Sequence, residues 1–390
     1  MKKYLFLALG VAALTSCSSD EVTELNQGNE IKFSVVADND SRAANIYCNN
    51  NLMDNFTLYA STGDKDFIVD EVYNNDNGEF KTTAKRYWPE NDALDFYAIK
   101  NAELTWDAGQ IPTGDFTVEP VVGDQVDFVY SVEKGKKKSD LDVVDGKVTL
   151  NFRHALSQIE FQAKNENPDL MVEILNVKVG NANSVGDFTF PNVSTKDNYV
   201  NHDGAVTPNP GAGVITWANQ ATPVNYQLDA DVTAVTLLKD DQVHPITYVK
   251  GDLTTYTNSM LLLPQTTAKW DGTKGSFLAV KCRIWNIIKD TNGDITDQVL
   301  LYGDKNNDGD GEGRWAFVPV DFNWAPGCKY IYTFNFTNGG NAGFDDSEGE
   351  DKPSNTPVLV NLTVDVTVDD FEPKDPANTP MEVEPFDLNP

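Results

Sequence analysis

Cys17 is the residue whose position indicates the most specific chemistry. It follows Leu14-Thr15-Ser16 at the end of an apolar run that starts at Tyr4, after two lysines. A basic start, a short apolar segment and small residues directly before a cysteine are typical of a bacterial secretion signal with a lipobox. We therefore expect residues 1–16 to be removed as a signal peptide and the Cys17 sulfur to carry lipid.

Two acidic loops have oxygen ligands at spacings that a metal ion could use. Asp304, Asn306 and Asp308 stand at positions 1, 3 and 5 of a calcium-type loop, with glycine at position 6. Position 12 is Trp315 instead of the glutamate that such loops use, and the run 290–294 is weaker still. Since Asp, Asn and Gly also dominate ordinary turns, the sequence predicts no cofactor and only a weak metal candidate.

The residues that catalyse reactions in other proteins are scarce here. The chain has 3 histidines, and the context of His154, inside an apolar strand junction, predicts a hydrogen-bonded core residue. The sequence contains no Gly-x-Ser-x-Gly elbow, no phosphate-binding glycine loop and no paired Cys-x-x-Cys motif. We predict no catalytic residues and no enzymatic activity; a surface hydrolase is a distant alternative.

Charge and cysteine content limit the partners and the compartment. There are 30 Lys and Arg against 60 Asp and Glu, a formal net charge of -30, which repels nucleic acid. Of the 4 cysteines, Cys48, Cys282 and Cys328 remain after Cys17, and an odd number implies at least one free thiol or an intermolecular bond. Cys282 and Cys328 both border strand-like runs, so they are the candidate disulfide pair.

These residues must be positioned by β-strands, because no segment carries a sustained helical stripe of apolar residues. Short alternating runs are separated by clusters of Gly, Asn, Asp and Pro, a pattern typical of β-sandwiches with Greek-key links. We expect an all-β chain with two antiparallel β-sandwich domains in tandem. The expected division is a lipidated acidic tether at 17–29, domains at 30–190 and 191–373, and a proline-rich tail at 374–390.

The clearest strand lies near the C-terminus. Its alternation is unbroken over eleven residues and places on one face Val358, Val360, Leu362, Val364, Val366 and Val368. The usual strand is about five or six residues long. The tail behind it contains a second, shorter set of apolar residues, namely Met381, Val383, Phe386 and Leu388.

Several short motifs, taken in order, resemble the fimbrillin-like proteins of Bacteroidales, which include the type V pilins. The first two motifs are the lipobox and the strand that ends before Ser41-Arg42-Ala43. The next two are Tyr87-Trp88-Pro89 with the run 94–98 after it, and the run 148–161 around His154-Ala155-Leu156-Ser157. The last two are the runs 186–191 and 326–332. The resemblance implies transthyretin-like sandwich domains, a lipoprotein on the cell outer membrane, and a structural subunit of surface fimbriae with a role in adhesion.

The resemblance also implies a route of assembly. In polymerising members an arginine-specific protease cuts after a residue placed like Arg42, which would make Ala43 the new N-terminus and remove the first strand, residues 31–37. A strand from another subunit would then fill the gap, in a head-to-tail homopolymer or with accessory subunits. The donor would be Val358–Val368, or alternatively Met381–Leu388 if the former is the last strand of its own domain.

Two alternatives to a polymerising subunit stay open. One is an anchor or tip accessory pilin, which would tolerate a tail rich in proline. The other is a surface lipoprotein that binds glycans or host ligands without polymerising. Exposed aromatic side chains on loops would favour the latter, and the candidates are Trp106, Trp217 and Trp270.

Overall fold

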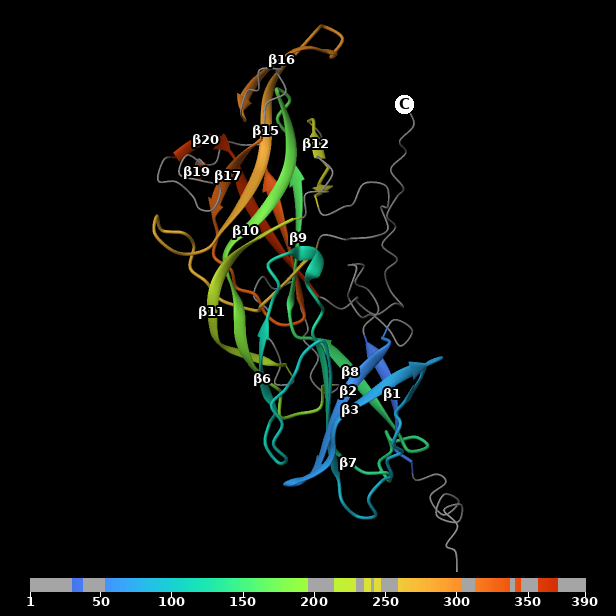
Figure 1. Ribbon diagram of the computed structural model, residues 1–390. Coiled ribbons are helices and arrows are strands. Elements are labelled where there is room, and N and C mark those ends of the chain that lie inside the picture. Colours follow the sequence, from blue (N-terminus) through green and yellow to red (C-terminus); the bar gives the residue numbers. More distant parts are fainter. Residues whose placement is uncertain are drawn as a thin grey trace, which may run out of the picture.

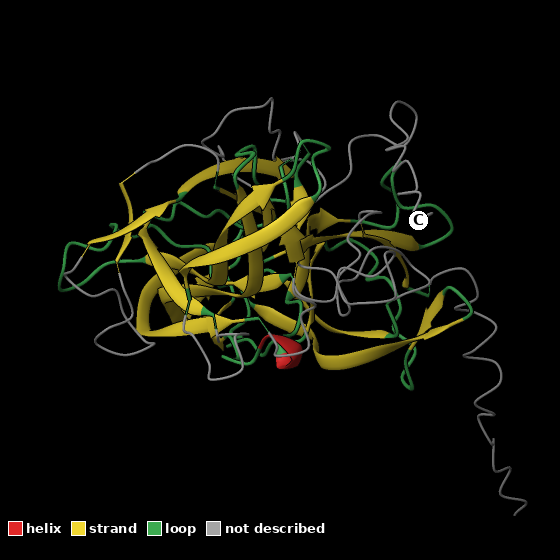
Figure 2. Cartoon of the chain, turned by 90° about the horizontal axis from the view of Figure 1, so that it is seen from above, coloured by secondary structure: helices red, strands yellow, loops and turns green. Residues whose placement is uncertain are grey.

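β-strands are the main secondary structure of the part of the chain that the structure describes. The computed structural model describes residues 30–37, 53–195, 214–228, 235–239, 242–246, 259–303, 313–336, 341–344 and 357–370. Figure 2 shows these residues as strands and loops, with a short 3-10 turn, η1 (Val122–Asp124). The all-β prediction is confirmed. No helix in the described ranges has the length and apolar character needed to cross a bilayer.

The first sheet has seven strands and forms the lower part of the elongated molecule in Figure 1. In spatial order they are β1 (Lys32–Ala37), β8 (Lys147–His154), β7 (Val129–Lys136), β5 (Leu94–Lys100), β2 (Asn55–Thr62), β3 (Lys65–Asp76) and β4 (Glu79–Lys81). β1 therefore lies at one edge of this sheet.

Two further sheets form the upper part. The nine-stranded sheet follows the order β11 (Thr216–Gln227), β10 (Leu170–Thr189), β15 (Phe277–Lys289), β17 (Arg314–Pro319), β19 (Asn341–Phe344) and β20 (Pro357–Asn361), with β6 (Thr113–Thr117) and β12 (Val235–Leu237) on β10 and β16 (Ile295–Tyr302) on β15. The five-stranded sheet contains β13 (His244–Pro245), β9 (Ser157–Lys164), β18 (Cys328–Asn335) and β21 (Thr363–Asp370), with β14 (Met260–Leu262) on β9.

The sequence predicts antiparallel sheets, but two of the described strand pairs are parallel. β1 pairs with β8 in parallel, and β9 pairs with β18 in parallel. In both cases many strands of the chain separate the two partners. A parallel pair needs such a long connection, whereas neighbouring strands joined by a tight turn must run antiparallel.

The central strands of the seven-stranded sheet are buried on both faces, which explains the nearly continuous apolar run of β5. On β5, Phe96 and Ala98 join a core that also contains the apolar residues of β1, β2 and β8. Their neighbours Tyr97 and Ile99 point the other way, into a larger core shared with the other two sheets. Successive side chains of a strand alternate between faces, so one strand can serve both cores.

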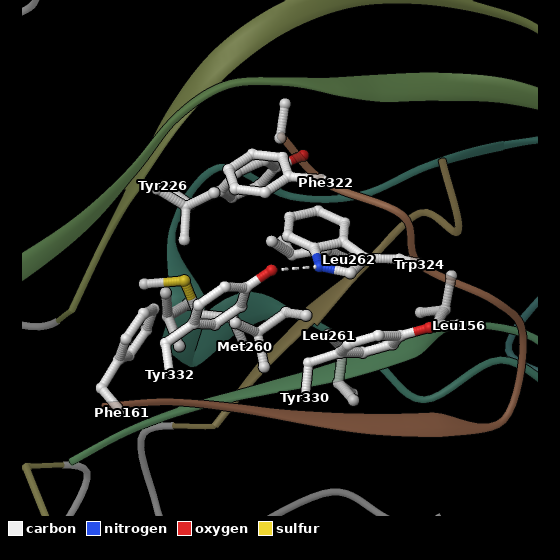
Figure 3. Close-up of a cluster of buried hydrophobic side chains, with 14 of the residues drawn as sticks. Leu156, Phe161, Tyr226, Met260, Leu261, Leu262, Phe322, Trp324, Tyr330 and Tyr332 are labelled. Carbon is white, nitrogen blue, oxygen red and sulfur yellow. Dashed lines mark hydrogen bonds between the residues drawn. The ribbon is translucent and has the colours of Figure 1, made fainter. Parts of the chain in front are cut away.

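The larger core holds the upper sheets together. Figure 3 shows Trp324 and Tyr332 packed among Met260, Leu261 and Leu262, with the indole Nε1 donating to the Tyr332 hydroxyl at 2.9 Å. The strands up to β8 belong to the seven-stranded sheet except for β6, which pairs with β10, and the strands from β9 onward belong to the other two sheets. The division expected at 190/191 falls between β10 and β11, which pair with each other, and it stays a prediction.

The candidate disulfide Cys282–Cys328 is wrong, because neither of these two buried cysteines forms a disulfide. Cys282 belongs to β15 in the nine-stranded sheet and Cys328 to β18 in the five-stranded sheet. Burial raises the pKa of the Cys282 thiol well above its usual range. Both thiols therefore occupy core positions and act as small apolar side chains.

Neither thiol should react in the native protein. Exposure to an alkylating reagent at pH 8, followed by digestion and mass spectrometry, should leave Cys282 and Cys328 unmodified. The same treatment in concentrated urea should label both, because the thiolate is the reactive species and needs access to solvent. Labelling of Cys282 in the native state as fast as in urea would contradict its position in the core.

Candidate functional site

The edge strand β1 is the element on which the predicted assembly route depends. It runs parallel to β8, with Phe33 beside Val148 and Val35 beside Leu150. Its side chains alternate as the sequence predicts: Ile31, Phe33 and Val35 are buried, while Lys32 is exposed. The strand thus covers an apolar surface from an exposed edge of the sheet.

Phe33 anchors β1 in the core of the seven-stranded sheet. Its side chain is only 2% exposed. Its ring lies edge-on to Tyr73 at 5.0 Å and to Phe96 at 5.5 Å between centroids, and Phe56 lies at 6.2 Å. Edge-to-face aromatic pairs add to the stabilisation that comes from burial alone. The ring therefore occupies a slot built by β2, β3 and β5.

The start of β1 is also held by the backbone. The Ile31 N–H donates to the carbonyl of Arg86 at 2.8 Å, and the Lys32 N–H donates to the carbonyl of Gly146 at 3.0 Å. An exposed ion pair joins Glu30 to Lys85 at 3.2 Å. β1 therefore lies in a gap between β8 and the segment around Arg86. Removing β1 would leave unpaired backbone groups beside an apolar floor.

The predicted C-terminal strand is divided into two in the structure. β20 pairs with β19 in the nine-stranded sheet, and β21 pairs along its whole length with β18, where Val366 stands opposite Tyr332. The break falls at Leu362, whose side chain is 1% exposed. Both parts lie in sheets of their own chain, and β21 is an edge strand.

β21 is less deeply buried than β1. Val364 is half-buried against the larger core, and Val366 is 38% exposed. Thr367, on the opposite face of the strand, is also exposed. An edge strand with such a shallow apolar face can be separated from its sheet at a lower cost than a strand anchored by a fully buried aromatic ring.

Other predicted site residues lie outside the described ranges. They are the lipidation residue Cys17, the cleavage residues Arg42 and Ala43, the alternative donor residues Met381, Val383, Phe386 and Leu388, and the candidate metal ligands Asp304, Asn306 and Asp308. Among the described residues, no group of three or more His, Cys, Asp or Glu is arranged to hold a metal ion.

The weaker acidic loop is a hairpin turn between β15 and β16. Asp290 Oδ1 accepts the backbone N–H groups of Asn292 at 2.8 Å and Asp294 at 3.0 Å, and Gly293 has φ +94. Its carboxylate therefore stabilises the turn, as Asp commonly does. His154 is a buried residue with Nδ1 3.0 Å from Asp127 Oδ1, so its prediction as a hydrogen-bonded core residue is confirmed.

The three tryptophans chosen as candidates for glycan binding differ in their surroundings. Trp270 is buried in a small cluster with Phe277, Trp315 and Phe317. Trp106 and Trp217 are half-buried, and both pack against the larger core. Trp106 donates to Asp66 at 2.7 Å.

Sequence reasoning identified β1 but missed its partner. The alternation of Val148, Leu150 and Phe152 marks β8 as a strand with one buried face. Nothing in that pattern specifies which distant strand it pairs with or in which direction. Only the folded chain shows that β8 would carry the exposed edge if β1 left.

This arrangement of sheets is also found in a bacterial fimbrial protein of known structure. The structure is similar to that of a fimbrial protein from Bacteroides vulgatus, with a TM-score of 0.55 and 13% identity over 88% of this chain and 99% of that one. A fimbrilin from Porphyromonas gingivalis matches with a TM-score of 0.41 and 14% identity over 89% of this chain and 98% of that one. A sequence comparison with curated proteins gives no significant match.

The sequence model of the fimbrillin-like family matches residues 41–368, so the chain belongs to that family. The resemblance seen in the sequence is confirmed. The protein is accordingly a pilin-like component of a cell-surface appendage, with a structural or adhesive role and no enzymatic activity.

Proposed function

We propose that this chain is a structural subunit of surface fimbriae that assembles by donor-strand exchange. It is exported as a lipoprotein on Cys17, reaches the outer membrane through that lipid, and is cut after Arg42. The observation that carries the proposal is the position of β1, an edge strand whose Phe33 fills the core of the seven-stranded sheet. Arg42 lies in the sequence between β1 and β2, and the next arginine is Arg86.

Loss of β1 creates a site that a second copy can fill. The vacated gap has the backbone of β8 on one side and the slots of Ile31, Phe33 and Val35 as its floor. An extended segment with alternating apolar residues supplies both the ladder hydrogen bonds and the side chains. Three such side chains contribute about 1.5–3 kcal/mol each before ordering costs are subtracted.

The donor comes from the C-terminal region. β21 pairs with β18 of its own chain in the monomer, so it must leave that sheet before it is donated, which its edge position permits. We favour it over the tail because the run 362–368 has the better pattern. Leu362, Val364, Val366 and Val368 share one parity, so all four point to one face of a continuous strand. In the alternative segment, Met381 and Val383 have odd residue numbers, whereas Phe386 and Leu388 have even ones, and Pro385 lies between the two pairs. One straight strand cannot place all four of those side chains on the same face, and proline removes a ladder donor.

Donation from the C-terminus of one copy to the N-terminal sheet of the next is heterologous. Such a contact repeats without closing and produces a filament. Because Cys17 precedes Arg42, the same cut separates the growing fibre from the lipid. A copy that escapes the cut would stay on the outer membrane, as an anchor subunit must.

Treatment with an arginine-specific protease tests the proposal. The purified precursor should be converted to a form that begins at Ala43, and a ladder of SDS-resistant oligomers should follow on gels. The Arg42→Ala variant is the matched control: it should be exported and folded as the wild type is, but stay monomeric. A precursor cut at Ala43 that remains monomeric would refute strand exchange, while an uncut Arg42 would refute this route of activation.

A further inference from the structure

A groove of about 520 Å³ lies beside the β10–β11 pair, away from β1. Its walls come from the start of β11 (215–220), the connection after β14 (264–266) and the segment before β18 (323–326). None of its thirteen lining residues carries a charge, although the chain has a formal net charge of -30. The volume falls within the range of about 300–1,000 Å³ that is usual for small-ligand sites.

The groove contains one half-exposed aromatic side chain, Trp217. Its indole Nε1 donates to the carbonyl of Ala155 at 3.0 Å. The rings of Phe116, Phe128 and Phe188 lie 5.8–6.3 Å from it, at interplanar angles of 67–83°. The indole is thus fixed in one orientation before any ligand arrives. A fixed ring lowers the entropy lost on binding.

Amide side chains stand next to this ring because of a β-bulge. Val185 pairs with Ala221 and Asp187 pairs with Ala218, so one residue of β10 faces two of β11, Asn219 and Gln220. Bulges redirect side chains and are common beside functional sites. Asn219 Nδ2 donates to Asp187 Oδ2 at 2.7 Å, and Gln220 Nε2 donates to the carbonyl of Pro264. Both amide nitrogens are therefore held, and both amide oxygens remain as acceptors.

The opposite wall supplies a donor. Asn323 is exposed, and its Oδ1 accepts a hydrogen bond from Thr266 Oγ1 at 3.2 Å. Its Nδ2 amide protons are thereby left for a ligand. The groove then presents acceptors on the β11 side and a donor across from them.

The backbone of β11 is strained at the groove and just beyond it. Asn219 has φ +48 and Thr222 has φ +56. A β-branched residue such as threonine rarely adopts positive φ, and such conformations concentrate at functional sites. Gly186 faces the bulge from β10, where an added Cβ would lie 3.3 Å from the Trp217 ring and 3.4 Å from Gln220. The fold therefore holds these side chains in an arrangement that local preferences alone would not produce.

We propose that this groove binds a neutral oligosaccharide. A sugar ring has an apolar C–H face, which packs on an indole, and hydroxyl edges that both donate to and accept from amides. The absence of charge from the lining gives no partner to a carboxylate or sulfate, and the negative field of the chain repels anionic glycans. The inference is independent of assembly, because no residue of the groove belongs to β1 or to β21.

Binding is tested with the full-length Arg42→Ala protein, so that polymerisation does not enter. The probe is an immobilised array of neutral oligosaccharides of hexoses, N-acetylhexosamines and fucose, printed beside sialylated and sulfated glycans. Binding should be confined to neutral glycans. The strongest of them is then titrated calorimetrically, and the double variant Asn219→Ala/Asn323→Ala should bind about tenfold more weakly or worse.

Two further variants separate recognition from folding. Trp217→Phe keeps an aromatic ring against the phenylalanines but loses the hydrogen bond to Ala155. It should weaken binding and lower the unfolding midpoint by a few degrees, while the protein still unfolds in one cooperative transition. Asn292→Ala, an exposed amide on the β15–β16 hairpin, is the matched control and should bind as the parent does.

Three outcomes would overturn the inference. The first is a folded protein that binds no neutral glycan on the array, or only acidic ones. The second is an Asn219→Ala/Asn323→Ala variant that keeps the affinity of the parent. The third is a synthetic peptide of residues 372–390 that occupies the groove while glycans do not, which would make it a peptide site.

Discussion

Replacing Phe33 with alanine is expected to lower the free energy of unfolding of the precursor by about 3–5 kcal/mol. The ring is fully enclosed, and its contacts with Phe56, Tyr73 and Phe96 come from three different strands. Truncation leaves a cavity that those rings cannot fill without moving. Urea denaturation of the Arg42→Ala protein, which keeps β1 covalently attached, measures the change.

Two controls connect the loss of stability to the removal of β1 during assembly. Ser34→Ala removes only a hydrogen bond between Ser34 Oγ and Thr149 Oγ1, 3.1 Å apart at an exposed position, and should change stability by about 0.5 kcal/mol or less. In the mature polymer residue 33 is gone, so Phe33→Ala should leave finished fibres as stable as wild type. A precursor that loses less than about 1 kcal/mol would show that β1 does not support the core.

The sequence was sufficient to predict β1 because its signal is local. Ile31, Phe33 and Val35 alternate with Lys32 and Ser34, and a period of two residues identifies both the strand and its buried face. The partner could not be predicted, because pairing with β8 joins segments more than a hundred residues apart. The parallel direction follows from the path of the chain between them, which no local pattern encodes.

For the C-terminal strand, the local pattern predicted the buried residues but not the division into two strands. Its alternation predicts one long strand, but β20 and β21 belong to different sheets, with the break at Leu362. Alternation specifies which side chains face a core and is silent on which core it is. Here Leu362 is buried where the chain passes from one sheet to the other. It continues the every-second-residue apolar pattern of both strands, so the pattern does not reveal the break.

The sequence indicated the uncharged groove only through Trp217, one of the three tryptophans that were candidates for glycan binding. The bulge at Asn219 and Gln220 arises because β11 has one residue more than β10 at this point of their pairing. Local patterns do not specify that register. Asn323 is more than a hundred residues away along the chain. Binding sites of this kind are assembled from loops by the tertiary fold, so composition and spacing alone do not reveal them.

Substituting lysine for Val366 should block assembly while leaving the monomer intact. In the monomer this side chain is 38% exposed on an edge strand, so a charge there has access to water and should change stability by about 0.5 kcal/mol or less. As a donor, the same residue must face the apolar floor of the next subunit. An unpaired ammonium group in such a site costs several kcal/mol, so oligomer yield should fall about a hundredfold or more.

Thr367→Lys is the matched control, because Thr367 is exposed in the monomer but lies on the other face of β21. It carries the same charge and should polymerise as the wild type does after treatment with the arginine-specific protease. The ladder of SDS-resistant oligomers measures assembly, and urea denaturation of the uncut forms measures the monomer. If Val366→Lys polymerises as well as Thr367→Lys, β21 is not the donor. A chain that ends at residue 373 would then fail to assemble, because Met381–Leu388 would be the segment that is donated.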